Sequence, residues 1–251
     1  MNRFEYVVYD GIDPCVYLKG ERSRTPFRWQ SQNLHPEEVD IVLSLGDRRY
    51  GEHLYRTDCP SCHACEPLRI PVQSFRRSKS QRKIWNRNQD IRVEIKPIQY
   101  TSEKLRLFNR HKLERGLAKN SRSESDYCNW FVDSCVNTIE FLYYIENKLI
   151  CVSILDKGEL DYSSVYVYFD PDYGRRSLGT FSALYELEWM RTQKLRYYYL
   201  GFYVKDCTRL NYKSQYYPHD RLFEGVWHRF ADSSVTKFSS QRIAHHESPL
   251  S

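Results

Sequence analysis

Residues 170–180 read Asp170-Pro-Asp-Tyr-Gly-Arg-Arg-Ser-Leu-Gly-Thr180, and the patterns on either side of this segment decide the fold. Residues 160–169 before it have strand character, and apolar residues at helical spacing after it predict a helix that begins near Ser177. Upstream, residues 138–145 and 149–155 have strand patterns and flank a hairpin signal. Residues 195–201 add a fourth strand. The predicted order is therefore three strands, a loop, a helix and a strand.

This order of elements resembles the acyltransferase fold of the GCN5-related N-acetyltransferases. We therefore predict an α+β protein with such an acyl-CoA N-acyltransferase-like core and a small N-terminal domain that contains cysteines. The expected boundaries are residues 1–90 for the N-terminal domain, 91–230 for the acyltransferase-like domain and 231–251 for a flexible tail rich in Ser and His.

In that fold, the loop before the helix donates backbone N–H groups to a phosphate of the acyl donor, and the helix dipole strengthens the attraction. Arg176 and Gly179 match the signature of this loop. Phe181 stands where the signature has a small residue. We expect this bulky side chain to obstruct the pyrophosphate of coenzyme A.

A cysteine cluster is the strongest local motif of the N-terminal part. Cys59, Cys62 and Cys65 lie three residues apart, and two-residue gaps let thiolates converge on one metal ion or iron–sulfur cluster. Cys15 is the one cysteine upstream of the cluster, and we pair it with the cluster as the fourth ligand. The alternative is a turn held by reduced, buried thiols.

The composition narrows the location and the partners of the protein. The 251 residues hold eight cysteines but no secretory signal pattern, which favours a reducing cytoplasm and a structural zinc or iron–sulfur cluster over disulfides. The longest apolar runs are too short to span a bilayer, so no membrane partner is expected. A formal net charge of +6 suits an anionic partner.

Two segments place basic residues where an anion can reach them. A predicted helix starts at Pro36 and ends at Gly46, and the loop 46–51 after it presents Arg48 and Arg49. Residues 76–87 carry six Arg or Lys and no acidic residue, in a helix that Ser78 or Ser80 can cap. Such a helix can hold a phosphate backbone, although a solvated basic face is the alternative.

Several segments, in this order, resemble the bacterial aspartate/glutamate leucyltransferases, which are relatives of the eukaryotic arginyl-tRNA–protein transferases of the N-degron pathway. The matching segments cover roughly residues 15 to 227 and are Cys15-Val-Tyr-Leu18, Gly46-Asp-Arg-Arg-Tyr-Gly51, Tyr55-Arg56, the cysteine cluster through Arg69-Ile70-Pro71, Arg77-Ser-Lys-Ser-Gln-Arg-Lys83, Asn88-Gln-Asp90, Val165-Tyr-Val-Tyr-Phe-Asp-Pro171, Ser177-Leu-Gly-Thr180, Tyr199-Leu-Gly-Phe-Tyr203 and Asn211-Tyr-Lys213. The family's first long helix typically carries Arg-His-x-x-Gly-x-Met. Here Glu114-Arg-Gly-Leu-Ala118 keeps an Arg and a Gly of that motif but lacks the His and the Met.

The resemblance implies an aminoacyltransferase that moves leucine, or alternatively arginine, from aminoacyl-tRNA to the N-terminal Asp or Glu of a protein and so marks it for degradation. No cofactor is required for this chemistry, because the ester of the charged tRNA is already activated. The acidic acceptor needs Arg side chains, since a guanidinium binds a carboxylate through two parallel hydrogen bonds. The candidates flank the cysteines and are Arg48, Arg49, Arg56 and Arg69.

The remaining candidate residues follow from the same reaction. For the catalytic site we name Asp156 and Asp170 as proton acceptors, with Tyr212 and Lys213 to orient the ester or bind terminal phosphates. The candidates for tRNA binding are Lys79, Gln81, Arg82, Lys83, Trp85, Arg176, Ser177, Gly179 and Thr180, with Trp85 stacked on a base. The structural alternative for each carboxylate is a turn or cap residue.

Two other functions fit parts of the chain. A coenzyme A-dependent N-acetyltransferase agrees with the predicted fold but is disfavoured by Phe181. A zinc-ribbon-like RNA-binding module agrees with the cysteines and the basic segment, but it leaves residues 138–213 unexplained.

Overall fold

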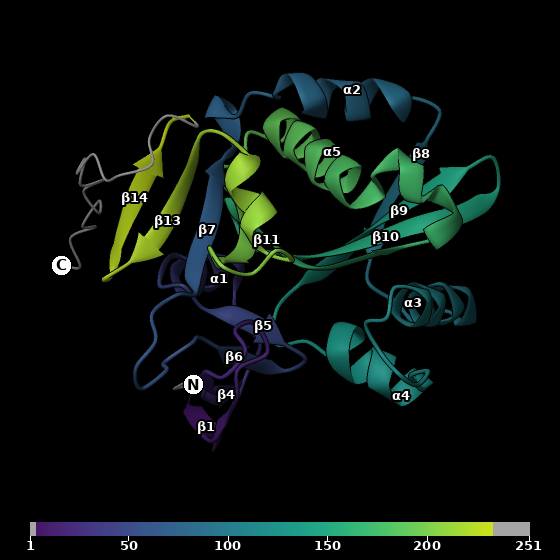
Figure 1. Ribbon diagram of the computed structural model, residues 1–251. Helices are drawn as coiled ribbons and strands as arrows, with labels where there is room; N and C mark the ends of the chain where they lie inside the picture. The colour runs from purple at the N-terminus through teal and green to yellow at the C-terminus, as the bar shows by residue number, and fades with distance from the viewer. Residues whose placement is uncertain (1–3, 233–251) are drawn as a thin grey trace.

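The computed structural model describes residues 4–232, and these form one large mixed sheet, a smaller antiparallel sheet and helices on both faces of the large sheet (Figure 1). The predicted tail falls almost entirely outside the described residues. The described helices include none that is both long and apolar enough to cross a membrane.

The large sheet has eight strands. Their spatial order is β14 (Val226–Phe230), β13 (His219–Phe223), β7 (Glu66–Pro71), β12 (Tyr197–Tyr203), β11 (Asp161–Phe169), β10 (Lys148–Lys157), β9 (Thr138–Ile145) and β8 (Arg92–Pro97). The pair β11 and β12 is parallel, and the other neighbours are antiparallel. Strands β9 to β12 confirm the predicted strand order. The C-terminal hairpin of β13 and β14 was not predicted.

The large sheet contains strands from both sides of residue 90, where the sequence suggested a domain boundary. Strand β7 comes from the predicted N-terminal domain but lies between β12 and β13 of the large sheet. Helix α2 (Lys79–Arg87) also precedes residue 90, yet it packs on α5 (Leu178–Thr192). Residues 66–90 therefore fold with the segment that follows them.

The smaller sheet holds the N-terminal part together. Its order is β1 (Glu5–Tyr9), β4 (Phe27–Gln30), β6 (His53–Tyr55) and β5 (Arg48–Tyr50), with a hairpin of β2 (Ile12–Pro14) and β3 (Arg22–Arg24) beside it. Helix α1 (Pro36–Ser44) starts at the predicted proline. The predicted loop at 46–51 is wrong in part, because residues 48–50 pair with β6 as a strand.

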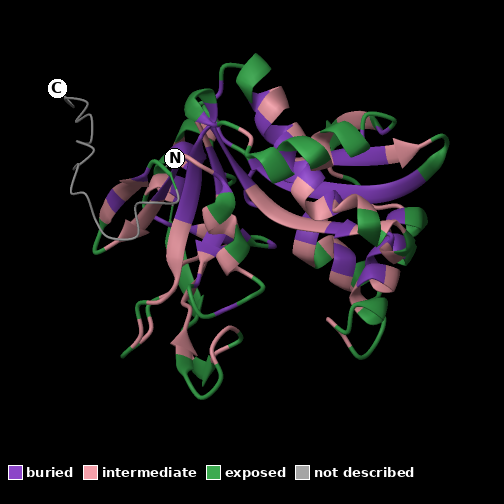
Figure 2. Cartoon of the chain, turned by 45° about the horizontal axis from the view of Figure 1, so that its top comes forward, coloured by how far each residue is buried: buried purple, intermediate pink, exposed green. Residues whose placement is uncertain are grey.

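Helices cover the large sheet on both faces (Figure 1). Helices α2 and α5 lie on one face, and α3 (Ser102–Glu114) and α4 (Glu124–Tyr127) lie near the other. The remaining short helical segments are η1 (Val72–Ser74), η2 (Cys128–Val132), η3 (Pro171–Arg176) and η4 (Asn211–Gln215). Figure 2 shows buried residues concentrated in the central strands of the large sheet, between these layers.

The apolar residues that predicted α5 form part of the main core. Phe181, Leu184 and Leu187 are buried there at helical spacing. Each such side chain contributes roughly 1.5–3 kcal/mol to folding through burial. The core thus anchors α5 and fixes the position of its first turn relative to the large sheet.

The parallel strands β11 and β12 pair over three residues only. Their pairing runs from Asp161 with Tyr197 to Ser163 with Tyr199 and stops there. Beyond this point each strand changes register with its other neighbour: β12 shifts against β7 near Gly201, and β11 shifts against β10 after Ser164. Beyond these residues β11 and β12 do not pair with each other, so their facing edges can line a cleft.

Candidate functional site

A cavity of about 730 Å³ lies where β11 and β12 stop pairing. Ser164 to Val167 and Phe169 of β11 form one wall, and Leu200 to Phe202 of β12 form another. The first turn of α5 and Arg48 from the small sheet also line it. The other lining residues are Tyr17, Tyr55, His111, Arg115, Leu117, Thr208, Arg209, Leu210, Tyr212 and Lys213. We call this cavity the cleft.

The cleft is cationic. Arg48, Arg115, Arg209 and Lys213 line it, and no Asp or Glu is among the described residues of its lining. The hydrogen-bond partners of these four side chains within the described residues are neutral: Arg209 donates to the carbonyl of Val16 at 2.8 Å, for example. An anion that enters the cleft therefore does not compete with a carboxylate of the lining.

Lys213 and Arg48 approach each other at Gly201. A Cβ at Gly201 would lie 3.2 Å from Nη2 of Arg48 and 3.3 Å from Nζ of Lys213, so glycine leaves room for both cations. Lys213 Nζ donates to the carbonyl of Phe202 at 3.0 Å. Burial, and then the charge of Arg48, lowers the pKa of Lys213 to about 7. This amine can therefore hold or release a proton near neutral pH.

Arg48 crosses from the small sheet to the large one. Its Nη1 donates to Ser163 Oγ at 2.9 Å, and its Nη2 donates to the carbonyl of Ser164. These partners fix the guanidinium at the point where β11 leaves β12. Of the four Arg residues proposed for the acidic acceptor, Arg48 alone lines the cleft.

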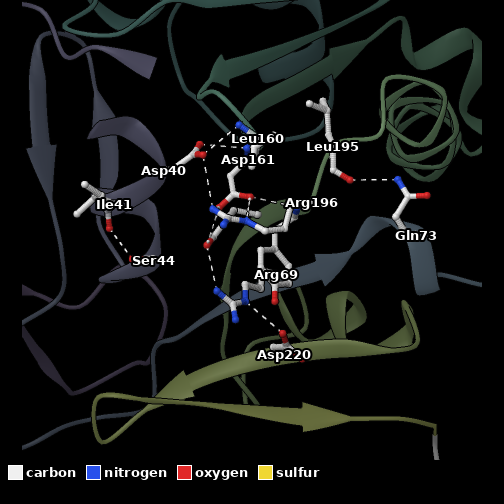
Figure 3. Close-up of polar contacts among 12 residues, drawn as sticks. Asp40, Ile41, Ser44, Arg69, Gln73, Leu160, Asp161, Leu195, Arg196 and Asp220 are labelled. Carbon is white, nitrogen blue, oxygen red and sulfur yellow. Dashed lines mark hydrogen bonds and ion pairs between the residues drawn. The ribbon is translucent and has the colours of Figure 1, made fainter. Parts of the chain in front are cut away.

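The other three Arg residues are neutralised by carboxylates. Arg49 Nε lies 2.8 Å from Asp156 Oδ1 in the interior, and Arg56 makes two hydrogen bonds to Asp47. Arg69 Nε lies 3.1 Å from Asp220 Oδ2 (Figure 3). Its guanidinium also covers the rings of Tyr197 and Trp227. Their assignment to the acceptor stays a prediction, and these contacts favour a structural role.

The two carboxylates proposed as proton acceptors also lie outside the cleft lining. Asp156 is buried, accepts from Arg49 and Thr138, and so closes an internal ion pair. Asp170 caps η3 through the N–H of Asp172 and pairs with Arg110 and Lys148 at 2.7 and 2.8 Å. The geometry thus supports the structural alternative for both residues, while Lys213 and Tyr212 do line the cleft.

A histidine that the sequence analysis missed also lines the cleft. His111 lies on α3 with Nδ1 3.0 Å from the carbonyl oxygen of Phe169 and Nε2 3.1 Å from Nη1 of Arg115. A guanidinium can only donate, so Nε2 accepts from Arg115, while Nδ1 faces both the carbonyl oxygen and the N–H of Phe169, each at 3.0 Å. Burial lowers the pKa of His111 to about 4, which keeps the ring neutral. The sequence signal was the pair Arg110-His111, which is separated from Gly116 by four residues rather than by two.

The first turn of α5 opens onto the cleft. Ser177, Gly179 and Thr180 line it, and Ser177 adopts a left-handed conformation with φ of 56° immediately before the helix. Arg176 does not line the cleft, because it makes two hydrogen bonds to Asp90 at 2.8 and 2.9 Å. Phe181 points into the core, so the expected obstruction of this site by its ring is wrong.

The basic helix α2 divides into exposed and packed residues. Lys79, Arg82 and Lys83 are exposed and can meet a phosphate backbone. Gln81 is buried because it forms the capping box with Ser78, which confirms the predicted cap. Trp85 packs on Phe181 and Tyr185 and is covered by the guanidinium of Arg77, which favours a packing role over base stacking.

The four cysteines proposed as metal ligands share the wall of one cavity of about 370 Å³. Cys15 Sγ accepts the N–H groups of Tyr17 and Leu18, and burial raises the pKa of Cys65 to about 12. Across residues 4–232, however, no group of three or more Cys, His, Asp or Glu is arranged to hold a metal ion. The thiols are therefore neighbours, but their side chains do not converge on one coordination centre.

The geometry of the cleft indicates which kind of substrate it takes. A cleft between diverging strands that is rich in basic residues and flanked by a helix N-terminus is a site for an anionic substrate. Two family models match the chain, the N terminus of the arginine-tRNA-protein transferases over residues 13–83 and their C terminus over residues 103–223. The chain belongs to this family and is an aminoacyltransferase.

Named relatives place the chain further within this family. The "Aspartate/glutamate leucyltransferase" of Acinetobacter baylyi is 34% identical over 91% of this chain and 85% of its own. The protein of the same name from Campylobacter jejuni subsp. jejuni is 35% identical over 84% and 90%. Among solved structures, L-PGS from Bacillus licheniformis covers 69% of this chain and 52% of its own with a TM-score of 0.43 and 13% identity. FemX covers 71% and 63% with a TM-score of 0.43 and 8% identity.

Proposed function

We propose that this protein transfers leucine from leucyl-tRNA to the α-amino group of proteins that begin with Asp or Glu. The names of its relatives support the leucyl donor and the acidic acceptor. The structural observation that carries the proposal is the cleft, in which four basic side chains face no carboxylate of the described lining. We further propose that the product enters the N-degron pathway of the cytoplasm.

The cleft supports a division of the two substrates between its ends. Gly179 at the start of α5 offers its backbone N–H and the helix dipole to a phosphate near the 3′ end of the tRNA, and Ser177 and Thr180 line the same turn. Arg48 and Lys213 lie near the point where the strands diverge, and we place the acidic side chain of the acceptor against Arg48. In this arrangement the ester carbonyl of the aminoacyl-tRNA lies next to the α-amino group of the acceptor.

The reaction forms an N–C bond and breaks the ester C–O bond of the aminoacyl-tRNA. The acceptor amine must lose a proton, and the ribose oxygen that leaves must gain one. Lys213 is the proposed proton acceptor, because a pKa of about 7 lets its neutral form exist at the pH where the amine must be deprotonated. Binding both substrates in one cleft supplies the remaining rate acceleration, because it holds the reacting groups close together.

Two proposals about the architecture accompany this function. We propose that β9 to β12 with α5 form a core like that of the GCN5-related N-acetyltransferases, supported by the strand order and by the separation of β11 from β12. Cys15, Cys59, Cys62 and Cys65 would hold zinc or an iron–sulfur cluster only after their side chains rearrange. No step of the reaction depends on that group.

A transfer assay with matched substrates tests the proposal. Radiolabelled leucyl-tRNA and arginyl-tRNA are each incubated with peptides that differ only in a first residue of Asp, Glu or Ala. We expect label on the Asp and Glu peptides with leucyl-tRNA and none on the Ala peptide. Transfer from arginyl-tRNA alone would replace the donor, and the absence of transfer from either tRNA would contradict the function.

A further inference from the structure

A second feature with a basic rim lies away from the cleft, between the start of α2 and the C-terminal half of α5. It is a groove of about 240 Å³ with an apolar floor that includes Phe75, Leu184 and Leu187. Figure 1 shows α2 lying over α5 on the face of the sheet where this groove forms. The groove is too far along α5 to belong to the cleft, because the two share no lining residue.

The rim of the groove is strongly basic. Arg76, Arg77, Arg82 and Arg191 line it, and Glu188 is the one carboxylate among its described lining residues. Glu188 accepts from both Arg77 and Arg191 and thereby holds two guanidiniums side by side. Arg77 is further fixed by its contact with the ring of Trp85, 3.7 Å from its centroid. Planar guanidiniums arranged in this way suit the oxygens of a phosphate.

Helix α2 connects this groove to the cleft. Its N-terminal end lies at the groove, where Arg77 meets Glu188. Its C-terminal end lies at the start of α5, where Asn88 donates to the carbonyl of Arg176 at 3.0 Å. The exposed cations Lys79, Lys83 and Arg87 lie between the two ends. One polyanion can therefore follow α2 from the groove to the cleft.

The separation of the two sites matches one feature of a tRNA. The groove residues of α5 lie about nine residues after the first turn, which is roughly 14 Å along the helix axis. The unpaired 3′ nucleotides of a tRNA, about four in number, extend roughly 14 Å beyond the acceptor stem when they stack. The 5′ end of the tRNA lies where that stem begins, and it carries a terminal phosphate with a charge near −2.

We infer that the groove between α2 and α5 binds the 5′-terminal phosphate of the tRNA while the cleft holds the 3′-aminoacyl end. The inference rests on the proposed function, because it assigns a second contact to the same tRNA. It explains why Arg residues gather around an apolar floor at this distance, since the floor can accept the sugar or base beside the phosphate. A protein with both contacts would recognise the end of an acceptor stem rather than RNA in general.

The test compares one tRNA sequence in two forms, with a 5′-monophosphate and with a 5′-hydroxyl. Dissociation constants are measured by filter binding at fixed salt for the wild type, for the Arg82→Ala/Arg191→Ala variant and for Lys83→Ala. Lys83 is the matched control because it is exposed on α2 but does not line the groove. We expect the wild type to prefer the phosphorylated form about tenfold, the effect of removing one charge-assisted hydrogen bond.

The groove variant should lose that preference, and Lys83→Ala should weaken both forms equally. Glu188→Gln should strengthen the preference, since it releases Arg77 and Arg191 from their carboxylate. Equal binding of both forms by the wild type, or an unchanged preference in the groove variant, would overturn the inference. Leucyl transfer by the wild type is measured in parallel: transfer without a 5′ preference rejects the groove alone, and no transfer rejects the proposed function.

Discussion

Arg48 and Arg49 are neighbours in the chain but point to opposite faces of β5. Arg48 reaches Ser163 and the carbonyl of Ser164 at the cleft, whereas Arg49 pairs with Asp156 in the interior. This alternation is the two-residue period of a strand. The same dipeptide thus supplies one cation that lines the cleft and one for the core.

Substitution of these two arginines should separate activity from stability. Arg48→Met is expected to abolish most transfer to Asp peptides with little change in melting temperature. Arg49→Met should lower the free energy of unfolding by about 3–5 kcal/mol, because it leaves Asp156 buried without its partner. Transfer assays and urea titrations of both variants check this, and equal loss of stability in both would contradict it.

If Lys213 is the proton acceptor, as we propose, the transfer rate should depend on pH. Burial lowers the pKa of Lys213 to about 7, so the neutral amine accumulates as the pH rises through 7. We expect the transfer rate at saturating substrate to rise about tenfold per pH unit below 7 and to level above it. Lys213→Met should remove both the activity and this rise. A flat profile between pH 6 and 8 in the wild type would exclude Lys213 as the proton acceptor.

The buried His111 predicts a loss of stability in acid. Its pKa is about 4 in the folded protein against 6.5 in the unfolded chain, so the unfolded chain binds more protons between these values. Stability is therefore complete above pH 6.5 and falls as the pH drops toward 4, by up to about 3 kcal/mol from this group. Urea titrations at pH 4.5 and 7 of the wild type and His111→Gln measure the difference. An equal acid effect in both proteins would assign it to other groups.

The cysteine cluster predicts a metal content. Cys62→Ser should release zinc or iron, measured by elemental analysis of protein purified without chelators, and should lower the melting temperature by several degrees. Protein prepared with and without air, compared by its absorption spectrum, distinguishes an iron–sulfur cluster from zinc. Unchanged metal content and unchanged melting temperature in the variant would show that the thiols only pack in the cavity.

The exposed cations of α2 predict a dependence on salt. Arg82→Ala/Lys83→Ala should reduce the slope of log binding constant against log salt concentration by up to about two, one for each phosphate that the variant no longer neutralises. Gln81→Ala is a useful comparison, because Gln81 is uncharged and its side chain makes contacts within the protein, to the N-cap of the helix and to the carbonyl of Gln215. Its slope should stay at the wild-type value. A wild-type slope in the double variant would move the RNA path away from α2.

The sequence by itself determined the elements whose signals are local. The proline of α1, the Ser78 cap of α2, the hairpin of β9 and β10 and the apolar spacing of α5 all appear where their residues predict them. Each depends on neighbours within a few positions, through backbone hydrogen bonds or one face of a helix. The loop that leads into α5 also followed from that local order.

Only the tertiary structure decided which charged residues are free. Arg49 and Arg69 meet Asp156 and Asp220, which lie more than a hundred residues away in sequence. No local pattern carries such a pairing, because it depends on how the two sheets and β7 come together. The same long-range packing turned Phe181 into the core and brought Arg48 and Lys213 together at the cleft, whose cations face no carboxylate of the described lining.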